Sequence, residues 1–312
     1  MKALVTGGAG FIGSHLVEYL IAQTIEVVVV DNLSMGCLEN IKQSDNVTVY
    51  VEDVRNQTFM QGLLQREQFD YIYFLAAVAS VADSIERPCE THEVNQNAVL
   101  NMLEFIRTAE LPIKQFLFTS SAAVYGNLPE FPKNEDARVS PLSPYAIDKY
   151  ATERYVLAYG ELYQLPTVCV RFFNVYGPRQ NPNSPYSGVI SILTDCLRKG
   201  RTFTLYGDGL QTRDFVYIKD VIQALWLITQ KSKHHQVFNI ANGRELTLAH
   251  IIKTYEKITG RNLEITPMAG RLGEVKRSVA SVGKLTKLGY ATNWSLKQGL
   301  TQYWKGAQCE TS

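Results

Sequence analysis

The sequence predicts a doubly wound α/β fold, in which helices cover both faces of a parallel sheet. Strand-like and helix-like segments alternate through the first half of the chain. The first short apolar run, Lys2–Thr6, leads into glycines and then into a helical pattern. Glu26–Asp31 is β-branched and nearly all apolar, which is typical of a strand covered on both faces. Strands arranged in this way are joined by right-handed crossovers.

The individual elements follow from periodicity. Ile12–Ala22 places Ile12, Leu16 and Leu20 on one face of a helix. Further strands are expected at Val47–Val51, Tyr71–Ala76 and Gln115–Ser120, and further helices at Asn95–Ala109 and Pro144–Leu162. Pro144 suits the first position of a helix, and Ser143 before it suits the N-cap.

After about Phe173 the pattern becomes irregular, and Asn174–Gly188 is rich enough in Pro, Gly, Asn and Tyr to predict a loop. The later elements expected are helices at Val189–Lys199, Lys219–Gln230, Leu246–Thr259 and Val282–Leu288, and a strand near Phe203–Tyr206. We therefore expect a dinucleotide-binding domain over 1–173. A lobe over 174–312, with some segments returning to the first domain, should close the crevice at the C-terminal edge of the sheet.

Composition excludes several classes of protein. The 312 residues are 46% hydrophobic and 20% charged, with a net charge of +1, so there is no electrostatic case for nucleic-acid binding. The five cysteines form no CxxC pair, which argues against a zinc site or a disulfide framework and fits a reducing cytoplasm. The histidines show no metal-ligand spacing, and no apolar run is long enough to span a membrane.

Three glycines lie between the first predicted strand and the first predicted helix. In this context Gly7, Gly10 and Gly13 are typical of a dinucleotide site. The first permits a tight turn, the second lets backbone N–H groups approach a pyrophosphate, and the third allows close packing of helix on strand. The helix N-terminus at Phe11 and Ile12 adds a partial positive charge for the phosphates.

Carboxylates at the ends of the second and third strands extend this predicted cofactor site. Asp31 can accept hydrogen bonds from a ribose 2′-hydroxyl and would repel the 2′-phosphate of NADP. The next residues, Asn32-Leu33-Ser34, include no arginine, so NAD is expected. Asp53-Val54 suits a contact with adenine, and a carboxylate that only orders the turn is the alternative.

A tyrosine and a lysine on one predicted helix form the candidate catalytic pair. Tyr145 and Lys149 are four residues apart and share one face. Tyrosine has an ordinary pKa of about 10, and a drop of roughly 3 units requires on the order of 4 kcal/mol. A lysine ammonium and a cationic nicotinamide nearby favour the phenolate. Alone, such a pair is mostly structural, but Ser120 and Ser121 end a strand where hydroxyls face the ligand crevice.

Taken together, these segments resemble the extended short-chain dehydrogenases/reductases of the NAD-dependent sugar epimerase and dehydratase group. The segments that carry the resemblance are Thr6–Gly13, Asp31-Asn32, Phe118–Gly126, Tyr145–Lys149, Arg171–Pro178 and Gly207–Phe215. The resemblance implies a Rossmann-type domain with a smaller C-terminal α/β lobe, bound NAD and a nucleoside-diphosphate sugar substrate. It also implies a homodimer in which the helices around 95–109 and 144–162 form a four-helix bundle.

Matching positions imply roles for single residues. Ser121 matches the catalytic serine, Tyr145 the base and Lys149 its partner. Further positions that match the cofactor site are Asn95, Phe173 and Leu75-Ala76-Ala77. Positions that match the substrate site are Asn174, Val189, Tyr206, Arg213, Arg271, Glu274 and Ser278. Guanidinium groups can grip pyrophosphate oxygens bidentately, which suits the two arginines.

The reaction is narrowed by a triplet that follows the serine-bearing strand. Sugar 4,6-dehydratases carry a Thr-Asp-Glu type triplet there, whereas this chain has Ser121-Ala122-Ala123. Elimination of water then lacks its general acid and base, and related decarboxylation is disfavoured for the same reason. Sugar-acid epimerases tend to have threonine in place of Asn174. The resemblance therefore favours 4-epimerisation through a transient 4-keto sugar.

One aligned position bears on substrate size. Ser278 matches the residue that limits space near the sugar C2, and its small side chain leaves room for a 2-acetamido group. We expect UDP-GlcNAc and UDP-GalNAc, with UDP-glucose and UDP-galactose left open; Ser184–Ile190 also resembles epimerases that serve polysaccharide synthesis. The alternatives are another NDP-sugar epimerase, a 4,6-dehydratase or reductase of the same family and, more remotely, a non-catalytic nucleotide sensor.

Overall fold

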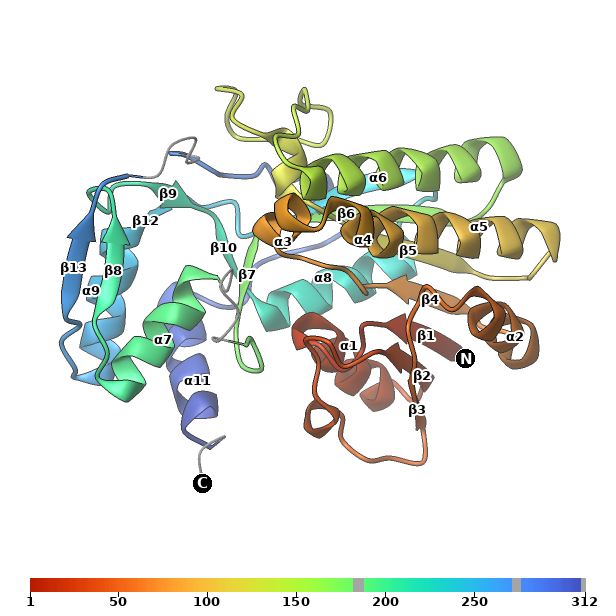
Figure 1. Cartoon of the computed structure of the whole chain (residues 1–312), viewed down its shortest axis with the longest axis horizontal. Coiled ribbons are helices and arrows are strands. Elements are labelled where there is room, and N and C mark those ends of the chain that lie inside the picture. Colours follow the sequence, from red (N-terminus) through yellow and green to blue (C-terminus); the bar gives the residue numbers. More distant parts are fainter. Residues whose placement is uncertain (182–187, 271–275, 310–312) are drawn as a thin grey trace. The chain divides into compact units, whose positions relative to one another are not determined.

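The computed structural model describes residues 1–181, 188–270 and 276–309, which divide into two compact units (Figure 1). The first unit contains residues 1–126, 139–172 and 225–238. The second contains 127–138, 173–224 and the chain from 239 onward. The chain thus leaves the first unit between Ser121 and Tyr145 and returns to it, so both candidate catalytic residues belong to the same unit.

The first unit is built on a seven-stranded sheet. Its strands are β1 (Lys2–Thr6), β2 (Glu26–Asp31), β3 (Val47–Val51), β4 (Tyr71–Phe74), β5 (Gln115–Ser121), β6 (Thr167–Phe172) and β11 (Gln236–Ile240). Their spatial order is β11-β6-β5-β4-β1-β2-β3, and neighbours from β6 to β3 pair in parallel. The order reverses between β1 and β4, which is the switch point where such sheets bind ligands. The predicted fold class is confirmed.

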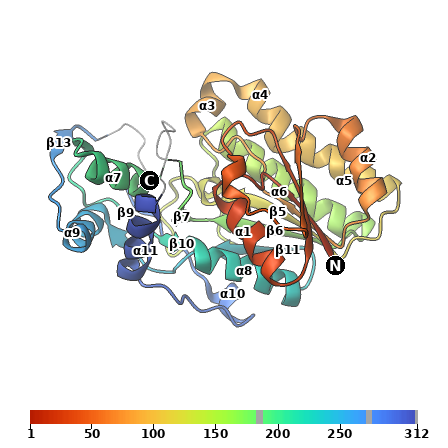
Figure 2. The ribbon, with the colours of Figure 1, turned by 90° about the horizontal axis from the view of Figure 1, so that it is seen from below.

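Helices cover both faces of this sheet. The helical elements are α1 (Phe11–Ala22), η1 (Leu38–Asn40), α2 (Gln57–Glu67), α3 (Val81–Glu86), α4 (Pro88–His92), η2 (Glu93–Asn97), α5 (Ala98–Thr108), η3 (Ala122–Tyr125), α6 (Pro144–Tyr163) and α8 (Ile218–Lys231). One face carries α2, α5 and α6 (Figure 1). The other carries α1 and the end of α8 (Figure 2). The rings of Tyr19 and Trp226, one from each of these helices, lie 6.0 Å apart.

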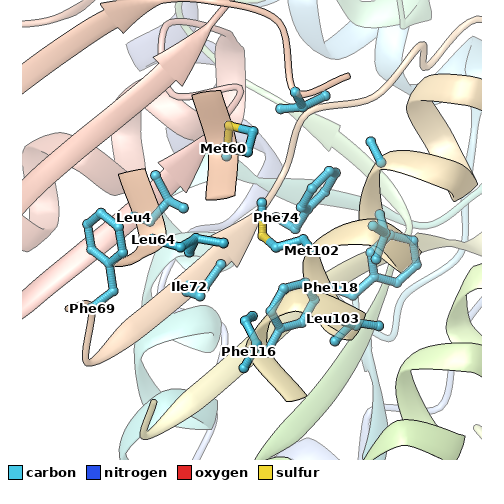
Figure 3. Packing of buried hydrophobic residues seen from close by; sticks show 14 of the residues in the cluster. Leu4, Met60, Leu64, Phe69, Ile72, Phe74, Met102, Leu103, Phe116 and Phe118 are labelled. Atoms are coloured by element: carbon cyan, nitrogen blue, oxygen red, sulfur yellow. The ribbon is translucent and has the colours of Figure 1, made fainter. Parts of the chain in front are cut away.

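The core of the first unit lies between the sheet and the α2–α5 layer. Figure 3 shows Leu4 and Phe74 from the strands facing Met60 and Met102 from the helices. These side chains are at most 3% exposed. Burial of each such side chain contributes roughly 1.5–3 kcal/mol. Phe118 belongs to the same cluster, so the strand that ends in Ser121 is anchored in the core.

Within the described ranges, the second unit contains three small two-stranded sheets, four helices and the first half of α8. The strand pairs are β7 (Asn174–Tyr176) with β10 (Phe215–Tyr217), β8 (Phe203–Tyr206) with β13 (Ile265–Met268), and β9 (Thr212–Arg213) with β12 (Leu246–Thr247). The helices are α7 (Val189–Lys199), α9 (Leu248–Thr259), α10 (Gly283–Thr286) and α11 (Leu296–Cys309). Their core includes Tyr255, whose hydroxyl lies 2.7 Å from Thr194 Oγ1 and whose ring meets Trp304 edge-on.

Three expected elements differ from the structure. The helix expected from Asn95 starts as the π-turn η2, and α5 begins only at Ala98. Leu246 and Thr247 form a short strand before α9, because Thr247 is the N-cap of that helix and accepts the His250 N–H. The stretch from Asn174, expected as loop, begins with β7, because parallel pairing with β10 holds its backbone extended.

Candidate active site

The glycine-rich turn after β1 forms the first part of the site. Gly7 has φ +70°, and a Cβ added there would lie 2.8 Å from the Ala76 backbone nitrogen. A Cβ on Gly13 would lie 2.1 Å from the Gly7 carbonyl oxygen, so neither position accepts a side chain. Gly10 is the N-cap of α1, and no side chain caps this helix terminus. The backbone N–H groups at Phe11 can therefore receive an anion, which fits a pyrophosphate.

Asp31 joins this turn to the end of β2. Its Oδ2 accepts the Ala9 N–H at 2.9 Å and its Oδ1 accepts the Leu33 N–H at 2.8 Å, and the residue is 8% exposed. A carboxylate has about four lone-pair directions, so two remain for ribose hydroxyls. Asp31, the residue predicted to bind the ribose, therefore also holds the glycine-rich turn in place.

Asp53 and Asn32 lie together beyond the ends of β3 and β2. Asn32 Nδ2 donates to Asp53 Oδ2 at 2.8 Å. Arg55, which the sequence reasoning missed, donates Nε and Nη2 to the two Asp53 oxygens at 2.9 and 2.8 Å. The guanidinium holds the pKa of Asp53 down at about 2. The Arg55 N–H also donates to Oδ1, so the carboxylate orders its own turn, and the contact of Asp53 with adenine stays a prediction.

Asn95 ties the loop after β4 to the site. Its Oδ1 accepts the Val78 N–H at 2.9 Å, and its Nδ2 donates to the Val78 carbonyl at 3.1 Å. The Asn95 carbonyl accepts Thr152 Oγ1 of α6 at 3.0 Å. At the start of the same loop, Leu75 and Ala76 donate their N–H groups to Thr6. The predicted Leu75–Ala77 segment, Asn95 and the catalytic helix are therefore connected, and the π-turn places Asn95 there.

The three predicted catalytic residues come together at the C-terminal end of β5. Ser121 ends this strand and hydrogen-bonds the Tyr145 hydroxyl from the first turn of α6. Lys149, one turn later, donates from Nζ to the Thr119 carbonyl at 2.9 Å and lies 4.9 Å from the centre of the Phe118 ring. The start of α6 is fixed by Ser143, whose hydroxyl accepts the Ala146 N–H, as the N-cap prediction required.

Burial sets the pKa values of Tyr145 and Lys149. Lys149 is 2% exposed, and desolvation lowers its pKa to about 7. Burial raises the pKa of Tyr145, while its hydrogen bond with Ser121 acts in the opposite direction. Both groups therefore resist ionisation, and a further positive charge beside them would favour the phenolate. A tyrosine and a lysine whose pKa values are shifted in this way can exchange a proton with a substrate hydroxyl.

A buried ion pair supports the catalytic helix one turn further on. Arg171 of β6 donates Nε to Glu153 Oε2 at 2.9 Å and Nη2 to Oε1 at 2.5 Å, and both residues are at most 3% exposed. Arg171 Nη1 also donates to the Tyr125 hydroxyl at 2.9 Å. Sequence reasoning missed this group, although Glu153 follows Lys149 by four residues on the same helix face.

The predicted substrate residues that the structure describes lie in the second unit. Arg213 is on β9, and the Ser278 N–H donates to the Thr212 carbonyl beside it at 3.2 Å. Asn174 Nδ2 donates to the Asp214 carbonyl at 2.8 Å. Val189 begins α7, Tyr206 ends β8, and Phe173 is buried with its N–H on the Ile240 carbonyl. Arg271, Glu274 and most of the Ser184–Ile190 segment lie outside the described residues.

Asp214, between Arg213 and β10, organises this part of the second unit. Its carboxylate accepts the N–H groups of Asn242, Gly243 and Ala280 at 2.9, 3.0 and 3.2 Å. Burial raises its pKa to about 6. The sequence reasoning did not single out this residue, because a lone aspartate next to an arginine carries no distinctive pattern.

No group of three or more histidine, cysteine, aspartate or glutamate side chains in the described ranges could hold a metal ion. Within those same ranges, no helix is both long and apolar enough to cross a bilayer.

Comparison with known proteins gives a consistent picture. Residues 3–241 match the model of the NAD dependent epimerase/dehydratase family. The UDP-glucose 4-epimerase of Thermotoga maritima, solved with UDP-glucose, is 36% identical with a TM-score of 0.94 over 100% of both chains. The UDP-N-acetylglucosamine 4-epimerase of Methanobrevibacter ruminantium, solved with UDP-N-acetylmuramic acid, is 33% identical with a TM-score of 0.93 over 99% and 98% of the chains.

A third structure bears on the cofactor. The UDP-glucose 4-epimerase of Thermus thermophilus in complex with NAD is 35% identical, with a TM-score of 0.91 over 99% of both chains. Proteins named as a UDP-glucuronate 4-epimerase and a dTDP-D-glucose 4,6-dehydratase also match. Similarity alone therefore leaves the reaction and the sugar open.

Proposed function

The chain belongs to the NAD dependent epimerase/dehydratase family, and we propose that it is a UDP-sugar 4-epimerase. The observation that carries this proposal is the catalytic segment itself. Ser121, Tyr145 and Lys149 lie together, while Ala122 and Ala123 in η3 supply no carboxyl group beside them. A proton-transferring pair can support the oxidation and reduction of a carbinol carbon, whereas elimination of water needs a further general acid and base, which Ala122 and Ala123 cannot supply.

The cofactor is NAD, and the described residues fit it. The uncapped N-terminus of α1 behind Gly10 suits the pyrophosphate, and Asp31 retains acceptor capacity for the adenosine ribose. Asp31 also disfavours a 2′-phosphate at that position. We assign the adenine end to Asp53 and Val54, and the nicotinamide end to the loop that Asn95 holds. When bound, NAD accepts a hydride from the sugar C4 and returns it.

The side chains of this unit supply the proton transfer in the proposed reaction. As the C4 carbinol is oxidised to a ketone, Tyr145 takes the proton from O4, and Ser121 hydrogen-bonds the same oxygen. Lys149 stabilises the phenolate before this step, because an ammonium within the same buried region favours a negative charge. The 4-keto sugar then turns over, C4 is reduced on its other face, and Tyr145 returns the proton to O4.

For the substrate, we propose UDP-GlcNAc and UDP-GalNAc, with UDP-glucose and UDP-galactose as further candidates. Ser278 is a small, half-buried residue beside the strand that carries Arg213, which supports space for a 2-acetamido group. One of the similar structures is named a UDP-N-acetylglucosamine 4-epimerase. By resemblance, Arg213 and Arg271 bind the diphosphate, with Asn174, Val189, Tyr206 and Glu274 as further substrate residues.

We also propose a homodimer built through α5 and α6. The outer face of α6 exposes large apolar side chains at helical spacing: Ile147, Tyr155 and Leu162 are 52%, 43% and 72% exposed. Such a stripe is favourable only when a partner covers it, and a second copy of the helix pair would complete a four-helix bundle. Free thiols at Cys37 and Cys89 support a reducing, cytoplasmic location.

The experiment that tests the function is an NMR assay of the purified protein with UDP-GlcNAc and, separately, UDP-glucose, without added NAD. We expect conversion of UDP-GlcNAc to UDP-GalNAc at the higher kcat/KM. Conversion of UDP-glucose alone would keep the mechanism and reject the argument from Ser278. A 4-keto-6-deoxy product, or no conversion even with NAD added, would reject the 4-epimerase proposal. Tyr145→Phe should remove the activity while the bound NAD remains.

A further inference from the structure

A buried carboxylate stands next to the catalytic lysine and takes no part in the proposed mechanism. Asp148 directly precedes Lys149 on α6 and is 6% exposed. Its Oδ1 lies 2.8 Å from Nδ1 of His92, the last residue of α4. A carboxylate that is withdrawn from water and held by one imidazole exerts a strong local field, because little solvent screens it.

Lys149 is positioned to respond to that field. Its ammonium contacts the Thr119 carbonyl and the face of the Phe118 ring, which are partial charges only. Burial lowers the pKa of Lys149, and the Asp148 carboxylate is the charged group that acts in the opposite direction. The pKa of Tyr145 responds instead to its own burial and to Ser121.

The other charged groups around this end of α6 face water or each other. On the packed elements α3, α4 and η2 they are Asp83, Glu86, Arg87, Glu90 and Glu93. Arg87 pairs with Asp83 and Glu90 at the surface. On β6, Arg171 is engaged by Glu153. Solvent screens the exposed charges, and the buried Glu153 charge is offset by Arg171, so among the described residues Asp148 is the buried carboxylate left beside the lysine.

We propose that Asp148 is a positioning residue that acts through Lys149, and that its carboxylate, held by His92, keeps Lys149 in the ammonium form that the Tyr145 phenolate requires. The proposal rests on the proposed function, because it takes Lys149 and Tyr145 as the catalytic pair. Its consequence is a wider alkaline range of activity than the buried lysine alone would allow.

The direct test is an NMR titration of Lys149 in the NAD-bound protein. The ¹³Cε resonance of this residue, assigned by its loss in Lys149→Arg, reports the protonation of the amine and needs no substrate. Asp148→Asn keeps the shape and a hydrogen bond to His92 but removes the charge. We expect the Lys149 midpoint to fall by about one pH unit, the size typical of a close charge partner.

Two matched variants distinguish the effect of the Asp148 charge from the effect of its contact with His92. His92→Gln replaces the imidazole with another hydrogen-bond donor and leaves the carboxylate, so the midpoint should stay within about 0.2 unit of the wild-type value. Glu161→Gln removes an exposed carboxylate further along α6 and should also leave it unchanged. A midpoint that Asp148→Asn does not move, or that His92→Gln moves equally, would overturn the proposal. Asp148→Ser serves as the neutral variant if the asparagine form does not fold.

The pH dependence of activity is a second measurement, and together with the NMR titration it tests the role of Asp148 separately from the proposed function. If the wild-type protein epimerises UDP-sugars, the alkaline limb of kcat against pH should move down by the same amount in Asp148→Asn and not in His92→Gln. If no UDP-sugar is converted, the proposed function fails while the NMR titration still decides the role of Asp148. An unshifted alkaline limb in an active Asp148→Asn enzyme would contradict the proposal even if the function holds.

Discussion

Asn95 and Val78 are joined by a pair of hydrogen bonds, in which the side-chain amide of one residue satisfies both main-chain groups of the other. The pair closes the loop after β4 against the π-turn η2, which breaks the regular helix at this position. Asn95 is 1% exposed, so water does not compete for these bonds. This arrangement explains how a residue early in a helix can shape a loop that lines the predicted nicotinamide side of the cofactor site.

Replacement of Asn95 by alanine should therefore weaken both folding and cofactor retention. The Val78 N–H and carbonyl would be left without their buried partners, at a cost of about 1–3 kcal/mol. We expect a lower denaturation midpoint and a reduced NAD content in the purified protein, measured from the nucleotide released by acid. Asn97→Ala, in the same turn but partly exposed, is the matched control. Equal NAD content in the two variants would show that the Val78 contacts do not hold the cofactor loop.

The buried pair Glu153 and Arg171 gives a second prediction. Glu153→Gln leaves the Arg171 guanidinium buried without its charge partner, and the loss of one partner of a buried pair typically costs about 3–5 kcal/mol. The double replacement by methionine, Glu153→Met with Arg171→Met, removes both charges and should recover much of that loss. Urea denaturation of Glu153→Met, Arg171→Met and the double variant measures this coupling. If the double variant loses as much free energy of unfolding as the two single variants together, the two residues are not coupled.

The proposed dimer depends on the apolar stripe of α6. Leu162→Glu places a charge at a position that is 72% exposed in the single chain, so it should leave the folded chain intact but prevent burial of the stripe. We expect a monomer in size-exclusion chromatography with light scattering, where the unmodified protein elutes as a dimer. Met268→Glu changes another exposed apolar residue, in β13, and should leave the mass unchanged. A dimeric Leu162→Glu protein would exclude this face as the interface.

Much of the first unit could be predicted because its signals are local. The strand at Glu26–Asp31 and the start of α6 at Pro144 follow from β-branched composition and from the Ser143 N-cap, each within a few residues of sequence. The catalytic pair follows from helical spacing once α6 is located. The family resemblance then supplied roles, such as that of Ser121, which a serine at the end of a strand does not reveal alone.

What the sequence did not reveal depends on contacts between distant segments. The π-turn at Asn95 follows from bonds to Val78 and Thr152, and helical periodicity has no signal for one additional residue in a turn. Arg55 and Asp214 are charged residues in turns, and their partners become visible only when the backbone N–H groups and carboxylates are placed. For the same reason β7 escaped prediction, since its partner β10 is about 40 residues away and its own composition is that of a loop.

Lys149 provides the last prediction, which concerns stability against pH. An unfolded chain holds the lysine proton up to a pKa near 10.5, whereas in the folded protein burial lowers this pKa to about 7. Between these values the unfolded state binds more protons, so the free energy of unfolding should rise with pH from 7 to 10.5. Below pH 7 the folded protein carries the buried Lys149 ammonium. Burial of this charge then lowers the free energy of unfolding by its full amount, up to about 5 kcal/mol for a shift of this size.

Lys149→Met should accordingly be more stable than the wild-type protein at pH 6, and this advantage should shrink as the pH approaches 10. The same variant should lose epimerase activity, because Tyr145 would have no ammonium to favour its phenolate. Urea denaturation at saturating NAD across this pH range measures the effect. Lys42→Met replaces a lysine that is 69% exposed and should show no such trend. A difference between Lys149→Met and wild type that does not vary with pH would mean that packing, and not the buried charge, separates the two proteins.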